Sequence, residues 1–204
     1  MRPLRAVLIA CLSLAYLPFA MAVPVWAEPV SLKALSDYLT NLKQVETTFT
    51  QLNDDGSLSS GVFQLKRPGK MRFEYDPPDQ ALVVAGANAL AIIDKRLGTA
   101  EQYGLRRTPL KLLLDRKVDL TDADIIVGHG ESNGLTTVTV FDPKTPEAGT
   151  MDLIFSPDPI TLKQWQVRDD SGAVTMVLLD AFNQNVDLPL SLFNVPIIVQ
   201  DYEN

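Results

Sequence analysis

Two short runs of alternating residues flank the turn sequence Arg-Pro-Gly at residues 67–69. Such alternation is typical of β-strands with one buried face, and Pro and Gly favour a tight turn, so residues 61–75 are predicted to form a β-hairpin. One face of this hairpin carries large apolar side chains and a single arginine: Phe63, Leu65, Arg67, Met71, Phe73 and Tyr75. A charge on an apolar face is costly unless acceptors reach it, so Arg67 needs a hydrogen-bonding partner.

Strand signals of this kind recur along the chain at roughly 8 to 12 residue spacing. They predict about eleven strands, at residues 45–52, 59–66, 71–75, 81–85, 89–93, 99–103, 124–129, 135–141, 150–155, 162–168 and 174–182. Most of the joins are turn clusters rich in Asp, Asn, Gly and Pro. Because a flat sheet of this size curls, we expect a mainly β fold with some α: an antiparallel meander that forms a partly or fully closed barrel.

Two segments show helical periodicity instead. Between Ser31 and Gln44 leucines recur at spacings of three and four residues, which predicts an amphipathic helix capped by Ser31. Thr108, Pro109 and the leucines that follow predict a second, short helix, with Thr108 as its cap and Pro109 in its first turn. We expect the helices to cover the barrel opening, and residues 28–204 to form one domain.

The first 27 residues have the features of a cleaved secretory signal peptide. Arg2 and Arg5 precede an apolar run, and a small-x-small site ends at Ala27. Cys11 ends a lipobox-like sequence, which would make the chain a lipid-anchored protein, but only about five apolar residues precede it. We therefore expect export, with Cys11 removed together with the signal.

Composition excludes several classes of function. Without Arg2 and Arg5 the chain has 16 basic and 25 acidic residues, a formal charge of −9, which disfavours nucleic acid and anionic membrane surfaces as partners. The only cysteine lies in the predicted signal, so the remainder has neither disulfides nor thiolate chemistry.

Catalytic and metal-binding motifs are not found in the sequence. The single histidine, His129, is not accompanied by a metalloprotease, nucleophile-elbow or phosphate-loop motif. The run from Asn53 to Gly56 lacks carboxylates at the calcium-loop positions and is predicted to be a turn. Acidic pairs for a glycosidase are available, but solvated turns explain them better: Asp122, Asp124, Asp152, Asp169 and Asp170. We expect no enzyme activity, no metal and no cofactor.

Binding is the remaining class. A barrel of this size with large apolar inward residues is either filled by its own side chains or encloses an apolar ligand, and composition does not decide between the two. Arg67 favours a partner near the apolar face, and carbonyl groups at the end of a short helix could provide the acceptors.

Several elements in order resemble the LolA family of periplasmic carriers for outer-membrane lipoproteins. They span nearly the whole chain after the signal: Val25-Trp26-Ala27, an opening helix that leads into Phe49-Thr50-Gln51, Lys66-Arg67-Pro68 with its aromatic strand, the Gly86 turn before a strand ending at Asp94, Thr108-Pro109-Leu110, and Leu162-x-x-Trp165-x-Val167-x-Asp169. The resemblance implies an unclosed antiparallel β-barrel of about eleven strands with a helical lid, whose interior takes up acyl chains.

The resemblance also implies roles for individual residues. Arg67 falls on the arginine that hydrogen-bonds the lid backbone and holds the empty carrier closed. The lumen-facing, acyl-binding positions would be Phe63, Leu65, Met71, Phe73, Tyr75, Leu82, Val84, Leu90 and Ile92, and the lid helix would contain Pro109, Leu110, Leu113 and Leu114. Met71 departs from the aromatic residue that the family often has there, which affects the shape of the pocket.

The implied partners are acylated lipoproteins, the inner-membrane ABC transporter that releases them and an outer-membrane acceptor, with the carrier a periplasmic monomer. Four other functions remain open. They are a periplasmic lipid- or lipoprotein-sensing regulatory module, a carrier that also inserts lipoproteins into the outer membrane, a membrane-anchored acceptor that starts at Cys11, and a carrier of other lipids.

Overall fold

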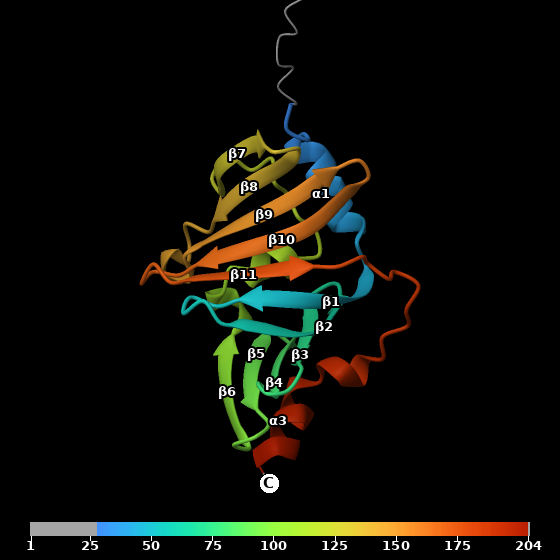
Figure 1. Ribbon diagram of the computed structural model, residues 1–204, viewed down its shortest axis with the longest axis vertical. Coiled ribbons are helices and arrows are strands. Elements are labelled where there is room, and N and C mark those ends of the chain that lie inside the picture. The colour runs from blue at the N-terminus through green and yellow to red at the C-terminus, as the bar shows by residue number, and fades with distance from the viewer. Residues whose placement is uncertain (1–27, 204) are drawn as a thin grey trace, which may run out of the picture.

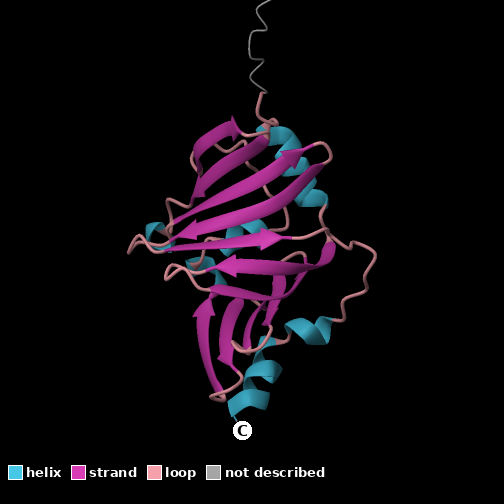
Figure 2. Cartoon of the chain, viewed as in Figure 1, coloured by secondary structure: helices cyan, strands magenta, loops and turns pink. Residues whose placement is uncertain are grey.

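A computed structural model describes residues 28–203, so the predicted signal peptide and Cys11 lie outside the described residues. The strands are β1 (Gln44–Leu52), β2 (Leu58–Lys66), β3 (Lys70–Tyr75), β4 (Ala81–Gly86), β5 (Ala89–Asp94), β6 (Thr99–Gly104), β7 (Ile126–Ser132), β8 (Leu135–Phe141), β9 (Thr150–Pro157), β10 (Ile160–Arg168) and β11 (Val174–Leu179). The helices are α1 (Leu32–Asn41), α2 (Leu110–Leu114) and α3 (Val195–Glu203), and 3₁₀ turns occupy Leu105–Arg107, Pro146–Ala148 and Leu190–Phe193 (Figure 2).

All eleven strands belong to one antiparallel sheet in the order β6-β5-β4-β3-β2-β1-β11-β10-β9-β8-β7 (Figure 1). Consecutive strands pair within β1–β6 and within β7–β11, as a meander predicts. The two halves, however, are joined by β1 and β11, and β6 and β7 are the outer edges. The sheet is therefore unclosed, because the chain between β6 and β7 forms α2 and a loop instead of a hairpin.

Helix α1 begins where the sequence predicts, with Ser31 Oγ accepting a hydrogen bond from the Ala34 amide at 3.3 Å. Its buried face packs on β9 and β10, where the Leu162 amide donates to the Tyr38 hydroxyl at 3.1 Å. On its other side, Ser36 Oγ accepts a hydrogen bond of 2.9 Å from the Leu120 amide. Helix α1 therefore connects one half of the sheet to the loop that follows α2.

Buried apolar residues form two clusters on opposite faces of the sheet. The larger one, here the inner cluster, includes residues from both halves of the sheet, from α1 and from α2. The smaller one, here the outer cluster, consists of Leu82, Val84, Ala91, Ile93, Val195 and Val199. Strand β4 thus packs against apolar residues on both faces, as does β5 near Leu90.

The outer cluster corrects the prediction that Leu82 and Val84 face the lumen. In β4, Val83 pairs with Phe73 and Ala85 pairs with Met71, and directly paired residues share a face. Leu82 and Val84 lie between these positions and so point to the other face, toward α3. Because β4 is apolar at every position, alternation could not indicate which residues point inward.

Helix α3 and the segment before it were not predicted. Val195 and Val199 are one helical turn apart and pack against β4 and β5, while Asn194 Oδ1 accepts a hydrogen bond from the Ile197 amide at 3.5 Å. This spacing, together with Asn194 and Pro196 at the start, is a helix signal that the sequence contains. Among the described residues, no helix has the length and apolar character needed to cross a membrane.

Two strand ends also differ from the prediction. Strand β7 covers Ile126–Ser132, which is later than the expected 124–129, and β11 ends at Leu179 instead of residue 182. The pairing of β7 with β8 has a register irregularity between Ile126 and Gly128, which interrupts the alternation of the strand.

Candidate functional site

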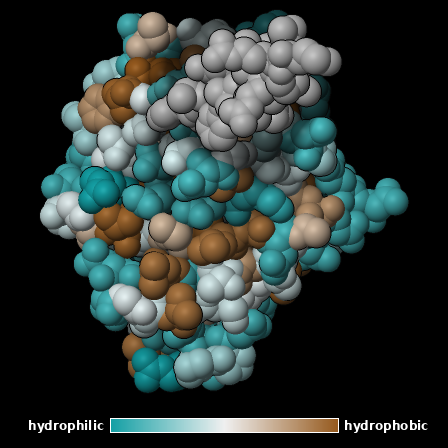
Figure 3. All heavy atoms as spheres, turned by 45° about the horizontal axis from the view of Figure 1, so that its top comes forward, coloured by the Kyte–Doolittle hydropathy of each residue, from teal (hydrophilic) through white to brown (hydrophobic). Residues whose placement is uncertain are grey.

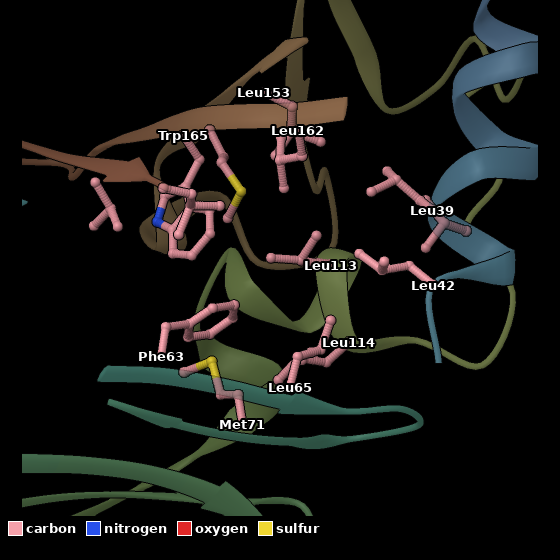
Figure 4. Packing of buried hydrophobic residues seen from close by; sticks show 14 of the residues in the cluster. Leu39, Leu42, Phe63, Leu65, Met71, Leu113, Leu114, Leu153, Leu162 and Trp165 are labelled. Carbon is pink, nitrogen blue, oxygen red and sulfur yellow. The ribbon is translucent and has the colours of Figure 1, made fainter. Parts of the chain in front are cut away.

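The predicted hairpin is present, and its apolar face forms one wall of the inner cluster. Phe63 pairs with Phe73 and Leu65 pairs with Met71, so these four side chains share a face, and each is at most 5% exposed. Figure 4 shows Phe63, Leu65 and Met71 from the hairpin on one side of α2, with Trp165, Leu153 and Leu162 of the other half of the sheet across from them.

Aromatic rings connect the two sides of the inner cluster. Phe63 lies 5.4 Å from Trp165 between ring centroids, and Phe49 lies 5.0 Å from both Phe73 and Tyr75. Phe49 and Trp165 were not among the predicted lumen residues. Both belong to the sequence elements that resemble the LolA family, and both are at inward positions of their strands, so the alternation in β1 and β10 could have identified them.

The wall continues toward the free edge at β6. Leu90 is in the inner cluster, and Ile92 shares its face because Ile92 pairs with Val83. Ile92 is 42% exposed, however, and so is not covered by the lid. Apolar side chains reach the surface in other places too (Figure 3), so exposure by itself does not make Ile92 a binding residue.

The helix predicted as the lid is α2, which has five residues and has Pro109 at its N-cap. Leu113 and Leu114 are buried in the inner cluster, and Leu110 and Pro109 are half-buried. The prediction that Thr108 caps α2 is wrong: Thr108 Oγ1 donates to the Leu105 carbonyl at 2.9 Å, and no side chain in the described part of the protein caps α2. A helix of five residues is unstable alone, so packing and contacts at its ends hold it in place.

The C-terminal end of α2 is bonded to the hairpin turn. The Gly69 amide donates to the Leu114 carbonyl at 2.8 Å, and Arg67 Nη1 donates to the Asp115 carbonyl at 3.1 Å. The Arg67 amide also donates to the Lys43 carbonyl, at 2.8 Å, just after α1. Arg67 therefore lies where the hairpin, the lid and the end of α1 meet.

Arg67 is buried but only partly hydrogen-bonded. The residue is 8% exposed, and among residues 28–203 neither Nε nor Nη2 has a hydrogen-bond partner. Burial lowers the pKa of Arg67 to about 10, and the nearby Asp115 carboxylate opposes that shift. The guanidinium remains charged at neutral pH and makes one side-chain hydrogen bond, to the lid backbone.

An open hollow of about 720 Å³ lies on the solvent side of the lid. Its lining comes from the hairpin turn, the turn between β4 and β5, the lid and the loop before β9: Pro68, Gly69, Lys70, Ala87, Asn88, Leu105, Arg106, Lys111, Leu114, Asp115, Arg116, Asp142, Lys144 and Thr145. Leu114 belongs to both the inner cluster and this lining, so the lid separates the apolar wall from the hollow.

Within residues 28–203 no group of His, Cys, Asp and Glu side chains is arranged to hold a metal ion. His129 lies on β7 with Nε2 3.0 Å from the Val30 carbonyl. The residues from Asn53 to Gly56 form the predicted turn, with the Gly56 amide donating to the Asn53 carbonyl at 2.9 Å.

Comparisons with known proteins agree with this architecture. The family model described as "Outer membrane lipoprotein carrier protein LolA" matches residues 40–196. A protein of Legionella pneumophila (strain Corby) named outer-membrane lipoprotein carrier protein is 30% identical over 175 residues, covering 80% of this chain and 84% of the relative. One of the same name from Nitrosomonas europaea is 29% identical over 206 residues, covering 93% of each chain.

Among solved structures, a DUF1329 family protein from Desulfovibrio piger superposes with a TM-score of 0.50 at 11% identity, covering 81% of this chain and 95% of that chain, which shows a shared fold. The match of the family model over most of the chain, together with the open eleven-stranded sheet, shows that this chain belongs to the LolA family of outer membrane lipoprotein carrier proteins.

Proposed function

We propose that this protein is a periplasmic carrier that binds the acyl chains of lipoproteins released from the inner membrane and delivers them to an outer-membrane acceptor. One observation carries the proposal. The apolar wall formed by β2 and β3 is covered by a five-residue helix, and Gly69 and Arg67 of the hairpin turn donate hydrogen bonds to its C-terminal end.

The physical problem of such a carrier is reversibility. Each buried CH₂ group contributes about 0.8 kcal/mol, so acyl chains cannot cross an aqueous compartment unaided. A site that gained this full energy would not release its cargo. Here Leu113 and Leu114 occupy the apolar wall in the closed form, so cargo must displace them (Figure 4). The lid contacts that re-form on release offset part of the binding energy.

Arg67 has a definite part in this scheme. Its hydrogen bond to the Asp115 carbonyl is made by a charged donor at the negative end of α2, where a cation is favoured. Breaking this bond opposes loading, and re-forming it assists release. Arg67 therefore acts as the lid latch.

The remaining features of the carrier are proposals that follow from the sequence and the family. Residues 1–27 would be the cleaved signal, and residues 28–204 would form one carrier domain that acts as a periplasmic monomer. An inner-membrane ABC transporter would supply the cargo. The protein would need neither catalysis nor a cofactor.

The test introduces a charge on the inner face and compares it with the same change outside. Ile92 is 42% exposed on the inner face and Leu178 is 43% exposed on the outer face, next to the inward Leu179. We expect Ile92→Glu to reduce capture of an acylated lipoprotein about tenfold or more, the factor for a charge that opposes binding by about 1.4 kcal/mol. Leu178→Glu should bind normally.

Phe73→Glu should abolish capture, because Phe73 is 5% exposed in the middle of the wall. Capture would be measured by the amount of lipoprotein that each variant removes from donor liposomes or a donor complex, after circular dichroism has shown that the variant is folded. Normal capture by Ile92→Glu would contradict binding at the inner face. An equal loss of lipoprotein capture in Leu178→Glu would indicate a general effect of added charge.

A further inference from the structure

Arg67 has more donors than its latch contact uses. A guanidinium carries five N–H donors in a planar fork, and Arg67 uses Nη1 for the Asp115 carbonyl. The two nitrogens without partners, Nε and Nη2, form the adjacent edge of the same plane. This edge presents two parallel N–H groups, the arrangement that binds two acceptor oxygens side by side.

These donors are buried where no described group satisfies them. Arg67 is only 8% exposed, so little of its side chain is open to bulk water. A buried donor without an acceptor is destabilising, and in native proteins such a group calls for an explanation. The lid contact accounts for Nη1 alone.

Arg67 is also the polar end of the apolar wall. Along β2 the inward positions run from Gly61 through Phe63 and Leu65, and Arg67 follows immediately after the strand. Successive inward positions are roughly 6.6 Å apart. At the opposite end the Tyr75 hydroxyl donates to Gln51 Oε1 at 2.7 Å. A chain laid along the wall would therefore have its polar head at Arg67.

The hollow beside the lid has room for the part of the cargo that lies beyond its polar head. Pro68 and Gly69, which come directly after Arg67, line the hollow together with Asp115, whose carbonyl accepts from Arg67. The residues that flank the latch thus lie at the boundary between the apolar wall and an open space of about 720 Å³. A ligand with its tail on the wall and its head at Arg67 would reach solvent here.

We propose that the free edge of Arg67, Nε and Nη2, is a recognition site for the ester carbonyl oxygens at the head of the acylated cargo, so that Arg67 selects acyl esters in addition to latching the lid. This inference rests on the proposed carrier function. The two roles use different nitrogens, so the lid bond and the ligand bonds do not compete for the same donor. Ester oxygens are the acceptors that distinguish an acylated glycerol from a plain hydrocarbon of the same length.

The experiment compares a dioctanoyl glycerol with its dioctyl ether analogue, which has the same chains without the carbonyl groups. Affinity would be measured by displacement of an apolar fluorescent probe from the purified protein. We expect the wild-type protein to bind the diester at least about tenfold more tightly than the diether, which corresponds to about 1.4 kcal/mol. In Arg67→Leu this ratio should fall to about one.

Two further variants separate charge from geometry. Arg67→Lys keeps the charge but has no planar fork, so the diester preference should fall several-fold while binding persists. Arg107→Leu removes an exposed cation that is not part of the lining of the hollow and should leave the ratio unchanged. An equal affinity of the wild-type protein for both ligands, or a preference that survives in Arg67→Leu, would overturn the inference. If neither ligand displaces the probe, the carrier function itself is wrong.

Discussion

Helices α2 and α3 cover opposite faces of the sheet in different ways. Helix α2 has five residues and closes the inner face through Leu113, Leu114 and two hydrogen bonds at one end. Helix α3 has nine residues, and its Val195 and Val199 complete the outer cluster on β4 and β5. The cover on the inner face is short and leaves a buried arginine half-satisfied, whereas the cover on the outer face is longer and apolar.

The outer cover is also fixed by its approach segment. A Cβ on Gly86 would lie 2.1 Å from the Phe193 carbonyl oxygen, so the chain before α3 runs in direct contact with the β4 backbone. Arg72 Nη1 donates to the Leu192 carbonyl at 3.5 Å and Nη2 to Glu74 at 2.8 Å. We infer that the outer face contributes stability, and that the inner face is the one able to open. The predictions below test this division.

The largest effect is expected at the outer cluster. Val199 is 4% exposed, so Val199→Asp buries a carboxylate without a partner and should lower the free energy of unfolding by about 3 kcal/mol or more. Ile197, on the same helix, is 55% exposed, so Ile197→Asp should change the free energy of unfolding by less than about 0.5 kcal/mol. Urea unfolding measures both. Equal stability of the two variants would show that α3 is not a structural cover.

A smaller loss is expected from Gly86→Ala. The added Cβ would collide with the Phe193 carbonyl and push the segment before α3 away from β4, at a cost of roughly 1–3 kcal/mol. At Gly130 the same substitution meets no atom within 4 Å, which makes Gly130→Ala the matched control. Thermal unfolding of the two variants gives the difference, and a Gly86→Ala protein as stable as the control would contradict the close contact.

Arg67→Leu tests the inner face and should separate release from stability. Replacing a half-satisfied buried charge by an apolar residue should change the free energy of unfolding by less than about 1 kcal/mol. Loss of the lid bond weakens closure, so release of the dioctyl ether ligand, which has no ester carbonyl groups for Arg67 to bind, should slow about tenfold, which corresponds to about 1.4 kcal/mol. Release of this ligand at the wild-type rate would show that Arg67 is not the latch.

Arg72→Leu is the counterpart of this variant on the outer face. Arg72 contacts the Leu192 carbonyl and Glu74 on the face of the sheet opposite to α2. Its loss should lower the free energy of unfolding by about 1 kcal/mol and leave the rate of release unchanged.

The smallest effect is a pH dependence at Glu74, on the outer face. Hydrogen bonds from Lys95 and then Arg72 lower the pKa of Glu74. The stability that these hydrogen bonds contribute is fully present above the unfolded-state pKa of about 4.3. It is lost as the pH falls through the lower pKa of the folded state. In Glu74→Gln the free energy of unfolding should fall less on acidification than in the wild-type protein. The difference should be less than about 1 kcal/mol, because the carboxylate is half-exposed. Acid titrations of both proteins, with Glu147→Gln as the exposed control, measure the difference.

The sequence predicted the hairpin and most strands because the relevant signals are local. Turn residues and alternation place Phe63, Leu65 and Phe73 on one face without information from distant parts of the chain. The same logic failed for Leu82 and Val84, since a strand buried on both faces has no polar side to indicate its orientation. Helix α3 was not predicted, because it packs on Leu82 and Val84, which were predicted to face the lumen.

At the candidate site too, the sequence predicted the local feature but not the long-range contact. Arg67 was identified as an anomaly from its position alone, but its acceptor, the Asp115 carbonyl, is 48 residues away along the chain. No local pattern specifies such a contact. The pattern predicted helices over the barrel opening, and the resemblance to a family added the bond between Arg67 and the lid backbone. The donors left without partners on Arg67 depend on the packed structure and cannot be predicted from spacing.

The pairing of β1 with β11 has a consequence for how the chain folds. Phe49 pairs with Leu179, so the second strand partner of β1 is synthesised only when most of the chain has already been made. Until then β1 presents an open strand edge, which is a template for pairing with other chains. Long-range pairing of this kind is also slow. We expect the newly made chain to depend on protection of the β1 edge from aggregation until β11 is made and covers it.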